Sequence, residues 1–127
     1  MIAPVFDHPI AVLAHQARVR GDAEALVFPA AGGRLSYAEW QDRSLRIAGA
    51  LQGLGIGCGD PIALLAENRI DWPVVQMAAA ALGALFVPLN THYRADDLGH
   101  ALQASGAKAI FLSERFRSNP YLDNVLA

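Results

Sequence analysis

The sequence predicts an α/β fold in which a mainly parallel sheet is flanked by helices. Three short apolar runs, at 61–66, 84–89 and 109–112, have the length and composition of buried strands. Helical patterns at 71–82 and 95–105 separate them, so strand and helix alternate along the chain. Strands joined through helices pair in parallel, and right-handed crossovers cover both faces of the sheet. We therefore expect a Rossmann-like, three-layer arrangement that amounts to half of a doubly wound sheet.

Three further elements are expected before the first of these strands. Residues 8–21 have the pattern of a short helix with proline near its first turn. Residues 25–28 and 34–35 predict two short extended pieces that form a small hairpin. Ser36 and Glu39 have the spacing of a capping box, in which each side chain satisfies a free backbone N–H of the other residue. A helix of about five turns should begin there.

This long helix should have one apolar and one polar face. Its apolar positions are Tyr37, Trp40, Ile47, Ala48, Leu51 and Leu54. The glycines that end it are Gly53, Gly55, Gly57 and Gly59. A phosphate-binding loop follows a strand and opens a helix, whereas this run follows a helix and precedes a strand. We therefore interpret the glycines as a helix end and a turn.

The composition is that of a globular chain with few charges. Of 127 residues, 54% are hydrophobic and 17% are charged, against roughly 25% charged in typical domains. This length fits one core, and the low charge suggests that part of the surface is covered by something else. The net charge is −2 and no block of Lys or Arg occurs, which argues against nucleic acid as a partner.

No segment is predicted to cross a membrane or to direct secretion. The 22 residues 72–93 contain no Asp, Glu, Lys or Arg, a gap long enough for a span. Pro73, Pro88 and the change from a helical to a strand pattern at Gly83 argue against a span. Residues 1–7 lack the basic and apolar regions of a secretory signal. The expected location is the cytoplasm.

The sequence offers no catalytic, cofactor-binding or metal-binding residue. Short motifs for phosphate-binding loops, serine hydrolases and zinc peptidases are all missing. His92 and His100 have no cysteine or carboxylate cluster at ligand spacing, so we interpret both as solvated. Cys58 is the single cysteine and is interpreted as a small residue in a turn. Asp96 and Asp97 fit the first turn of a helix, where carboxylates offset the helix dipole.

Four segments carry a resemblance to a known family: 35–40 (LSYAEW), 59–68 (GDPIALLAEN), 83–90 (GALFVPLN) and 105–109 (SGAKA). In this order and spacing they resemble the N-terminal region of the AMP-forming, adenylate-forming superfamily. That superfamily includes acyl-CoA synthetases, luciferases and the adenylation domains of peptide synthetases. The resemblance extends over about 11–113, and the PLNTHYR segment looks most like fatty or aryl acyl-CoA synthetases.

The resemblance implies a reaction for the full-length enzyme. A carboxylate attacks the α-phosphate of Mg-ATP to give an acyl-adenylate and pyrophosphate, and the thiol of CoA then displaces AMP. The phosphate loop, the ribose-binding aspartate and the catalytic lysine of the family lie downstream of the matched region. Lys108, the only lysine, belongs to the segment before the third strand and does not match that catalytic lysine. We therefore expect 1–127 to be a first subdomain, incomplete relative to the family fold, catalytically silent alone and without ATP, Mg or CoA of its own.

The expected partner is the remainder of the parent enzyme. One alternative is a self-standing α/β interaction module that pairs with a covering protein; a homodimer is also open. A small enzyme of flavodoxin-like topology would need a phosphate loop after its first strand, which 67–69 (ENR) is not. Residues 114–127 have weak periodicity and are either helical near 119–120 or frayed. The fragment hypothesis also predicts an unusually large exposed apolar patch.

Overall fold

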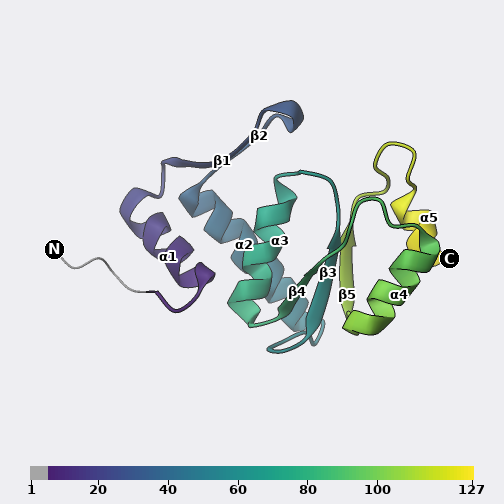
Figure 1. Cartoon of the computed structure of the whole chain (residues 1–127). Coiled ribbons are helices and arrows are strands. Elements are labelled where there is room, and N and C mark those ends of the chain that lie inside the picture. Colours follow the sequence, from purple (N-terminus) through teal and green to yellow (C-terminus); the bar gives the residue numbers. More distant parts are fainter. Residues whose placement is uncertain (1–5) are drawn as a thin grey trace.

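Three strands form a parallel sheet between two layers of helices in the computed structural model, which describes residues 6–127 (Figure 1). The elements in chain order are α1 (Pro9–Arg20), β1 (Glu24–Phe28), the 3-10 turn η1 (Pro29–Ala31), β2 (Gly33–Ser36), α2 (Tyr37–Gly53), β3 (Pro61–Leu65), α3 (Asp71–Leu82), β4 (Leu85–Pro88), α4 (Ala95–Ser105), β5 (Ala109–Leu112) and α5 (Tyr121–Leu126). The predicted boundaries from β3 to β5 agree to within one residue. The expectation of no secretory signal concerns residues that lie largely outside those described.

The parallel sheet predicted from the alternating pattern is confirmed. β3 is the central strand, with β4 and β5 on either side and both parallel to it. In this register Ile62 of β3 lies opposite Phe86 of β4 and Ala109 of β5. Within residues 6–127, β4 and β5 each have one edge without a partner strand. The centre of the sheet is therefore enclosed, while both of its edges remain open.

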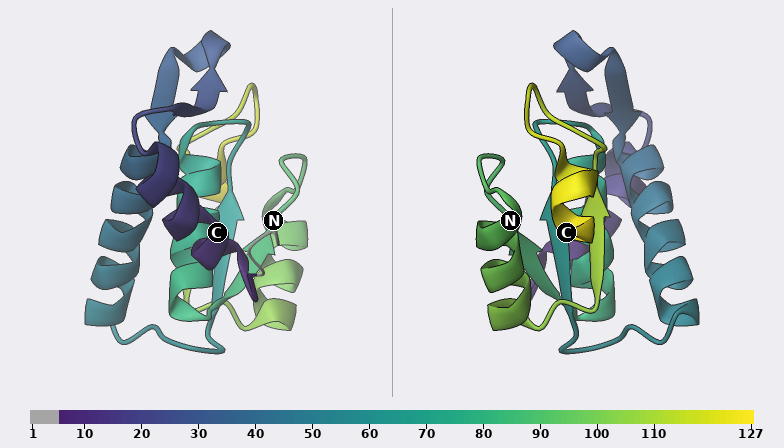
Figure 2. Two further views of the ribbon diagram at one scale, coloured as in Figure 1. Left: turned by 90° about the vertical axis from the view of Figure 1, so that its left-hand side faces the viewer. Right: turned by 90° about the vertical axis from the view of Figure 1, so that its right-hand side faces the viewer.

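Successive side chains of β3 pack into two different helical layers. These layers lie on opposite faces of the sheet (Figure 2). Ile62 packs with Val75 of α3 and with residues of α2, whereas Ala63 packs with Leu98 of α4 and Tyr121 of α5. The connection from β3 to β4 and the connection from β4 to β5 cross the sheet in opposite directions. Their helices, α3 and α4, lie on opposite faces of the sheet. Both crossovers therefore have the same hand, as the right-handed rule requires.

Helix α2 begins and packs largely as expected. Ser36 Oγ accepts from the Glu39 amide at 3.2 Å, and Glu39 Oε2 accepts from the Ser36 amide at 2.8 Å, so the capping box is confirmed. Leu54 is a correction, because the residue is 77% exposed and does not lie on the apolar face. The helix ends at Gly53, and Leu54 leaves the helical path as its C-cap. Gly55, at φ +85°, then opens the turn toward β3, which agrees with a helix end rather than a phosphate loop.

The N-terminal hairpin stands apart from the sheet, as Figure 1 shows. β1 and β2 pair antiparallel, which confirms the predicted hairpin. Its tip approaches the loop after β3, because an added Cβ on Gly33 would lie 3.0 Å from Ile70 Cδ1. The side chain of Ile70 thus occupies the space that a side chain at position 33 would need.

The C-terminal segment contains one short helix, which begins just after the expected position near 119–120, while 114–120 form a loop. Asn119 and Tyr121 are buried, and α5 packs on the same face of the sheet as α4. Helix α3 is less enclosed than its composition predicts, because only Val74, Val75, Ala78 and Ala79 are buried while most of its other residues are half-buried. None of the helices within residues 6–127 has both the length and the apolar character needed to cross a membrane.

Candidate functional site

The carboxyl edge of the sheet is the first place to look for a site. In open α/β sheets, ligands bind outside the carboxyl ends of the strands, where the strand order reverses direction. From β3 the chain passes to β4 on one side, and from β4 it crosses back over β3 to β5 on the other side. The reversal of strand order therefore lies between the ends of β3 and β5. Glu67 follows β3 after one residue, and Ser113 follows β5 directly.

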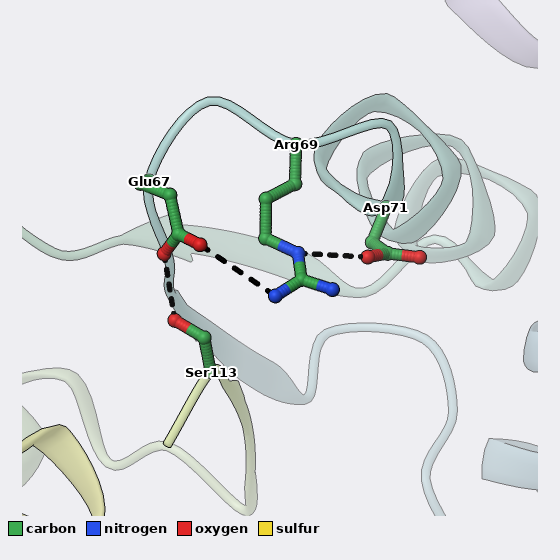
Figure 3. A network of polar contacts seen from close by, with 4 residues as sticks. All are labelled: Glu67, Arg69, Asp71 and Ser113. Carbon is green, nitrogen blue, oxygen red and sulfur yellow. Dashed lines mark hydrogen bonds and ion pairs between the residues drawn. The ribbon is translucent and has the colours of Figure 1, made fainter. Parts of the chain in front are cut away.

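A network of four polar side chains occupies this position (Figure 3). Ser113 Oγ donates to Glu67 Oε2 at 2.7 Å, which joins the two strand ends. Arg69 Nη1 lies 3.5 Å from Glu67 Oε1, and Arg69 Nε donates to Asp71 Oδ2 at 3.1 Å. One guanidinium therefore lies between two carboxylates, and the network carries a net negative charge.

Two clefts flank the network. One of about 210 Å³ opens on the α2 and α3 side, where Ile47, Val75 and Phe111 give it an apolar floor. The other, of about 400 Å³, lies between the hairpin and the loop after β3. It is lined by Gly33 and Ile70 together with Glu67, Arg69 and Asp71 of the network. The first cleft lies over the carboxyl ends of β3 and β5, because Leu64 and Phe111 both line it.

The network does not fit the phosphates of ATP or a magnesium ion held by this chain alone. Asp71 is the first residue of α3, so a carboxylate stands where a phosphate-binding helix would present only free N–H groups. Glu67 adds a second negative charge, and Arg69 is already engaged by both. No group of three His, Cys, Asp or Glu side chains that could hold a metal ion occurs within residues 6–127.

Lys108 lies at the other end of the sheet. Its Nζ is 2.6 Å from Asp60 Oδ1, just before β3 and β5 begin. The hydrogen bond from Lys108, followed by that from the Gly57 amide at 2.8 Å, holds the pKa of Asp60 below its usual value. The lysine therefore ties two strand starts together, at the edge opposite the Glu67 network.

The remaining residues singled out in the sequence do not converge. His92 lies in the loop after β4, where its amide and Nδ1 approach Asn90 Oδ1 at 2.9 and 3.2 Å. His100 is exposed on α4, and Cys58 is exposed in the turn before β3. Asp97 Oδ2 accepts from the Arg94 amide at 3.1 Å, which is the helix-capping role expected of the first turn.

Sequence reasoning missed the polar residues that hold the C-terminal segment. Asn119 is 6% exposed, and its Nδ2 donates to the carbonyl oxygens of Thr91 and Tyr93, both at 2.9 Å. Tyr121 donates its hydroxyl to the same Thr91 oxygen at 3.2 Å, and burial raises the pKa of this phenol. The only sequence signal was an Asn-Pro pair before a short helix, which gives no indication of distant partners.

Comparison with known proteins identifies the family to which this chain belongs. The model of the family described as AMP-binding enzyme matches residues 13–126. Because the match spans most of the chain, the chain belongs to the AMP-binding enzyme family, and the resemblance seen in its sequence is confirmed.

Several of the individual proteins that the chain resembles are named as CoA ligases. The chain is 38% identical over 107 residues to the acyl-CoA ligase sidI of Aspergillus fumigatus, covering 84% of the chain and 18% of that protein. It is 34% identical over 116 residues to the long-chain-fatty-acid–CoA ligase FadD13 of Mycobacterium tuberculosis, covering 91% of the chain and 23% of that protein. The crystal structure of the N-terminal domain of FACL13 from Mycobacterium tuberculosis superposes with a TM-score of 0.87 at 32% identity, over 96% of this chain and 31% of that one. The chain thus spans about a fifth of the length of the curated relatives it matches.

Proposed function

We propose that this chain is the N-terminal part of an AMP-forming acyl-CoA synthetase. The observation that carries the proposal is the family match over residues 13–126, together with relatives whose names are those of acyl-CoA ligases. In the complete enzyme, ATP and a carboxylic acid give an acyl-adenylate, and CoA then takes the acyl group. Relatives named as long-chain and medium-chain ligases support an aliphatic acid as the substrate class.

Uncovered surface supports the assignment to a larger protein. The free edge of β5 and the apolar cleft beside it leave backbone groups and side chains open to a further strand. Helix α5 follows β5 and lies on the α4 face of the sheet. By the right-handed rule, a strand that followed such a helix would lie beside β5, on the side where the edge is free.

The chain alone is proposed to be catalytically silent and to bind neither ATP nor Mg. Supporting this, the loop after β3 holds two carboxylates around one guanidinium and has no glycine-rich turn. Its contribution is then structural, as a sheet and helix scaffold behind the pockets that the remainder of the enzyme completes. A cytoplasmic location remains a prediction.

The first experiment is to read the gene beyond the codon for Ala127 and to assay both forms of the protein. A continuing frame with a Ser/Thr/Gly-rich segment ending in Pro-Lys-Gly supports the proposal. The longer protein should then exchange pyrophosphate into ATP when a fatty acid is present, and the 127-residue chain should not. Exchange by the 127-residue chain would overturn its silence, and an immediate stop codon would favour an independent interaction module.

A second measurement tests the uncovered surface directly. The purified chain should bind an apolar dye such as ANS and should associate as its concentration rises in sedimentation experiments, because the β5 edge and its cleft are bare. A strictly monomeric chain that binds no dye would contradict the presence of an apolar surface that another part of the protein normally covers. Stable dimers would instead identify a second copy as the cover.

A further inference from the structure

A cavity of about 460 Å³ lies between α1, α2 and α3. It shares no lining residue with the two clefts beside the Glu67 network. Phe6, Asp7 and His8, which precede α1, line one part of it, and Met77 of α3 lines another. The volume falls in the range of roughly 300–1,000 Å³ in which small-molecule sites occur, so the cavity can hold an organic ligand.

Three aromatic side chains line this cavity: Phe6 before α1, and Tyr37 and Trp40 of α2. Trp40 Nε1 donates to the Pro73 carbonyl oxygen at 3.0 Å, which fixes the indole against α3. The centre of the Phe6 ring lies 5.2 Å from the centre of the His15 ring, so Phe6 is held against α1. Because the faces of aromatic rings carry negative potential, a group of rings around a cavity attracts cations.

Among residues 6–127, the lining of the cavity includes one carboxylate and no guanidinium or ammonium group. The carboxylate is that of Asp7, which takes part in none of the ion pairs of the described chain. Asp7 also precedes α1, where a carboxylate offsets the helix dipole. Pro9 begins this helix without an N–H that an anion could use. A cation therefore fits these charges better than an anion.

Gln16 of α1 adds an acceptor that has no donor. Its Oε1 is buried and has no hydrogen-bond partner among residues 6–127, and Gln16 also lines the cavity. A buried oxygen without a donor leaves the negative end of the amide dipole uncompensated. A positive charge in the cavity compensates this dipole through space, without a hydrogen bond.

We propose that this cavity binds an organic cation, namely an alkylated ammonium group attached to an apolar body. Asp7 and the aromatic rings attract the charged nitrogen, and the apolar side chains of Val12, Leu13 and Met77 contact the body. A fully alkylated nitrogen has no N–H to satisfy, which suits a lining with few acceptors. The proposal goes beyond the proposed synthetase chemistry and does not depend on it, because every lining residue lies between 6 and 77.

The first test compares choline with 3,3-dimethylbutan-1-ol, in which a carbon atom replaces the charged nitrogen. Each is titrated into the 127-residue chain at constant ionic strength and at pH 8, where histidine is ordinarily uncharged. Binding is followed through the NMR signals of the Met77 methyl group and the Trp40 indole N–H. We expect saturable shifts with choline and binding of the alcohol that is weaker by about fivefold or more. Hexyltrimethylammonium should bind more tightly than choline, because its chain fills the apolar part of the cavity.

Two pairs of variants separate the charge from the rings. Asp7→Asn should weaken choline binding several-fold, while Asp22→Asn makes the same change of charge at an exposed residue that does not line the cavity. Tyr37→Leu should weaken binding about threefold or more, while Tyr37→Phe keeps the ring and should bind as wild type does. Far-UV circular dichroism and the Trp72 signal check that each variant is folded.

Clear results overturn the proposal. It fails if choline causes no saturable shift, or if the neutral alcohol binds as tightly, which would make the cavity a site for apolar molecules of any charge. It also fails if Asp22→Asn weakens binding as much as Asp7→Asn does, because the carboxylate at the cavity would then have no special role. If Tyr37→Leu does not fold, the comparison of the two ligands and the pair of Asp variants still decide the outcome.

Discussion

Ser113 Oγ donates a hydrogen bond of 2.7 Å to Glu67 Oε2, and this bond joins the carboxyl ends of β5 and β3. The two residues are 46 positions apart in sequence. The backbone continues the same connection, since the Ser113 amide donates to the Leu65 carbonyl oxygen at 3.3 Å. The ladder between β3 and β5 therefore extends by one backbone bond and one side-chain bond beyond the last paired strand residues.

Ser113→Ala should lower the free energy of unfolding by about 1 kcal/mol. The bond is charge-assisted, but Glu67 is one quarter exposed, so water replaces part of what is lost. Urea unfolding at neutral pH measures the change. Ser118→Ala is the control, because Ser118 is exposed and its side chain makes no hydrogen bond with residues 6–127. Equal losses in the two variants would show that the Glu67 bond contributes nothing.

The Asp60–Lys108 pair should make stability depend on pH on the acid side. The pKa of Asp60 is lower in the folded chain than in the unfolded chain, so the stabilisation is complete above the unfolded value, near 3.8, and is lost as the pH falls through the folded value. Asp60→Asn should therefore be less stable than wild type at pH 7, with a difference that narrows below pH 4. Chemical unfolding at both pH values checks this.

Lys108→Gln should reproduce part of the same loss, because its hydrogen bond is the largest cause of the lowered pKa of Asp60. In the double variant the two losses should not add, since both substitutions break one contact. Full additivity would mean that the contact contributes nothing in solution.

Gly83→Ala should destabilise the chain more than Gly106→Ala. Both glycines end a helix at positive φ, +70° and +66°, where an L side chain costs about 1–2 kcal/mol. An added Cβ on Gly83 would also lie 3.1 Å from Cys58 Sγ, whereas one on Gly106 would meet nothing within 4 Å. Cys58→Ala in the Gly83→Ala background should recover the excess, because the Cβ of residue 58 is 3.6 Å away. Thermal unfolding of the variants decides this, and equal losses would contradict the contact.

Asn119→Ala should cost about 2–3 kcal/mol of unfolding free energy, because Asn119 is buried and its side chain holds several hydrogen bonds. The substitution leaves the Tyr93 carbonyl oxygen and the Arg94 guanidinium without this partner in a partly buried place. Asn68→Ala is the matched control, since Asn68 is exposed and its side chain has no recorded bond within the described range. Hydrogen exchange should show α5 opening more readily in the Asn119 variant only.

The sequence predicts the sheet because the signals there are local and periodic. The strand runs, the helix between each pair and the capping box of Ser36 all depend on neighbouring residues, and all are observed. Leu54 was misplaced because periodicity does not show at which residue a helix ends. The role of Asn119 could not be predicted, because it depends on hydrogen bonds to Thr91 and Tyr93, which are distant in sequence and come together only in the folded chain. The pairing of Glu67 with Ser113 likewise follows from strand order, which the alternating pattern leaves open.

The bare edge of β5 has a consequence for the order of events during synthesis. In the longer protein proposed above, if it has the length of its relatives, which are about five times as long as this chain, several hundred residues would follow after this part has emerged from the ribosome. At roughly 5–20 residues per second, those residues take on the order of tens of seconds to appear. The nascent sheet must remain unaggregated over that interval, and the short length of β5, four residues, limits how firmly another chain can pair with it.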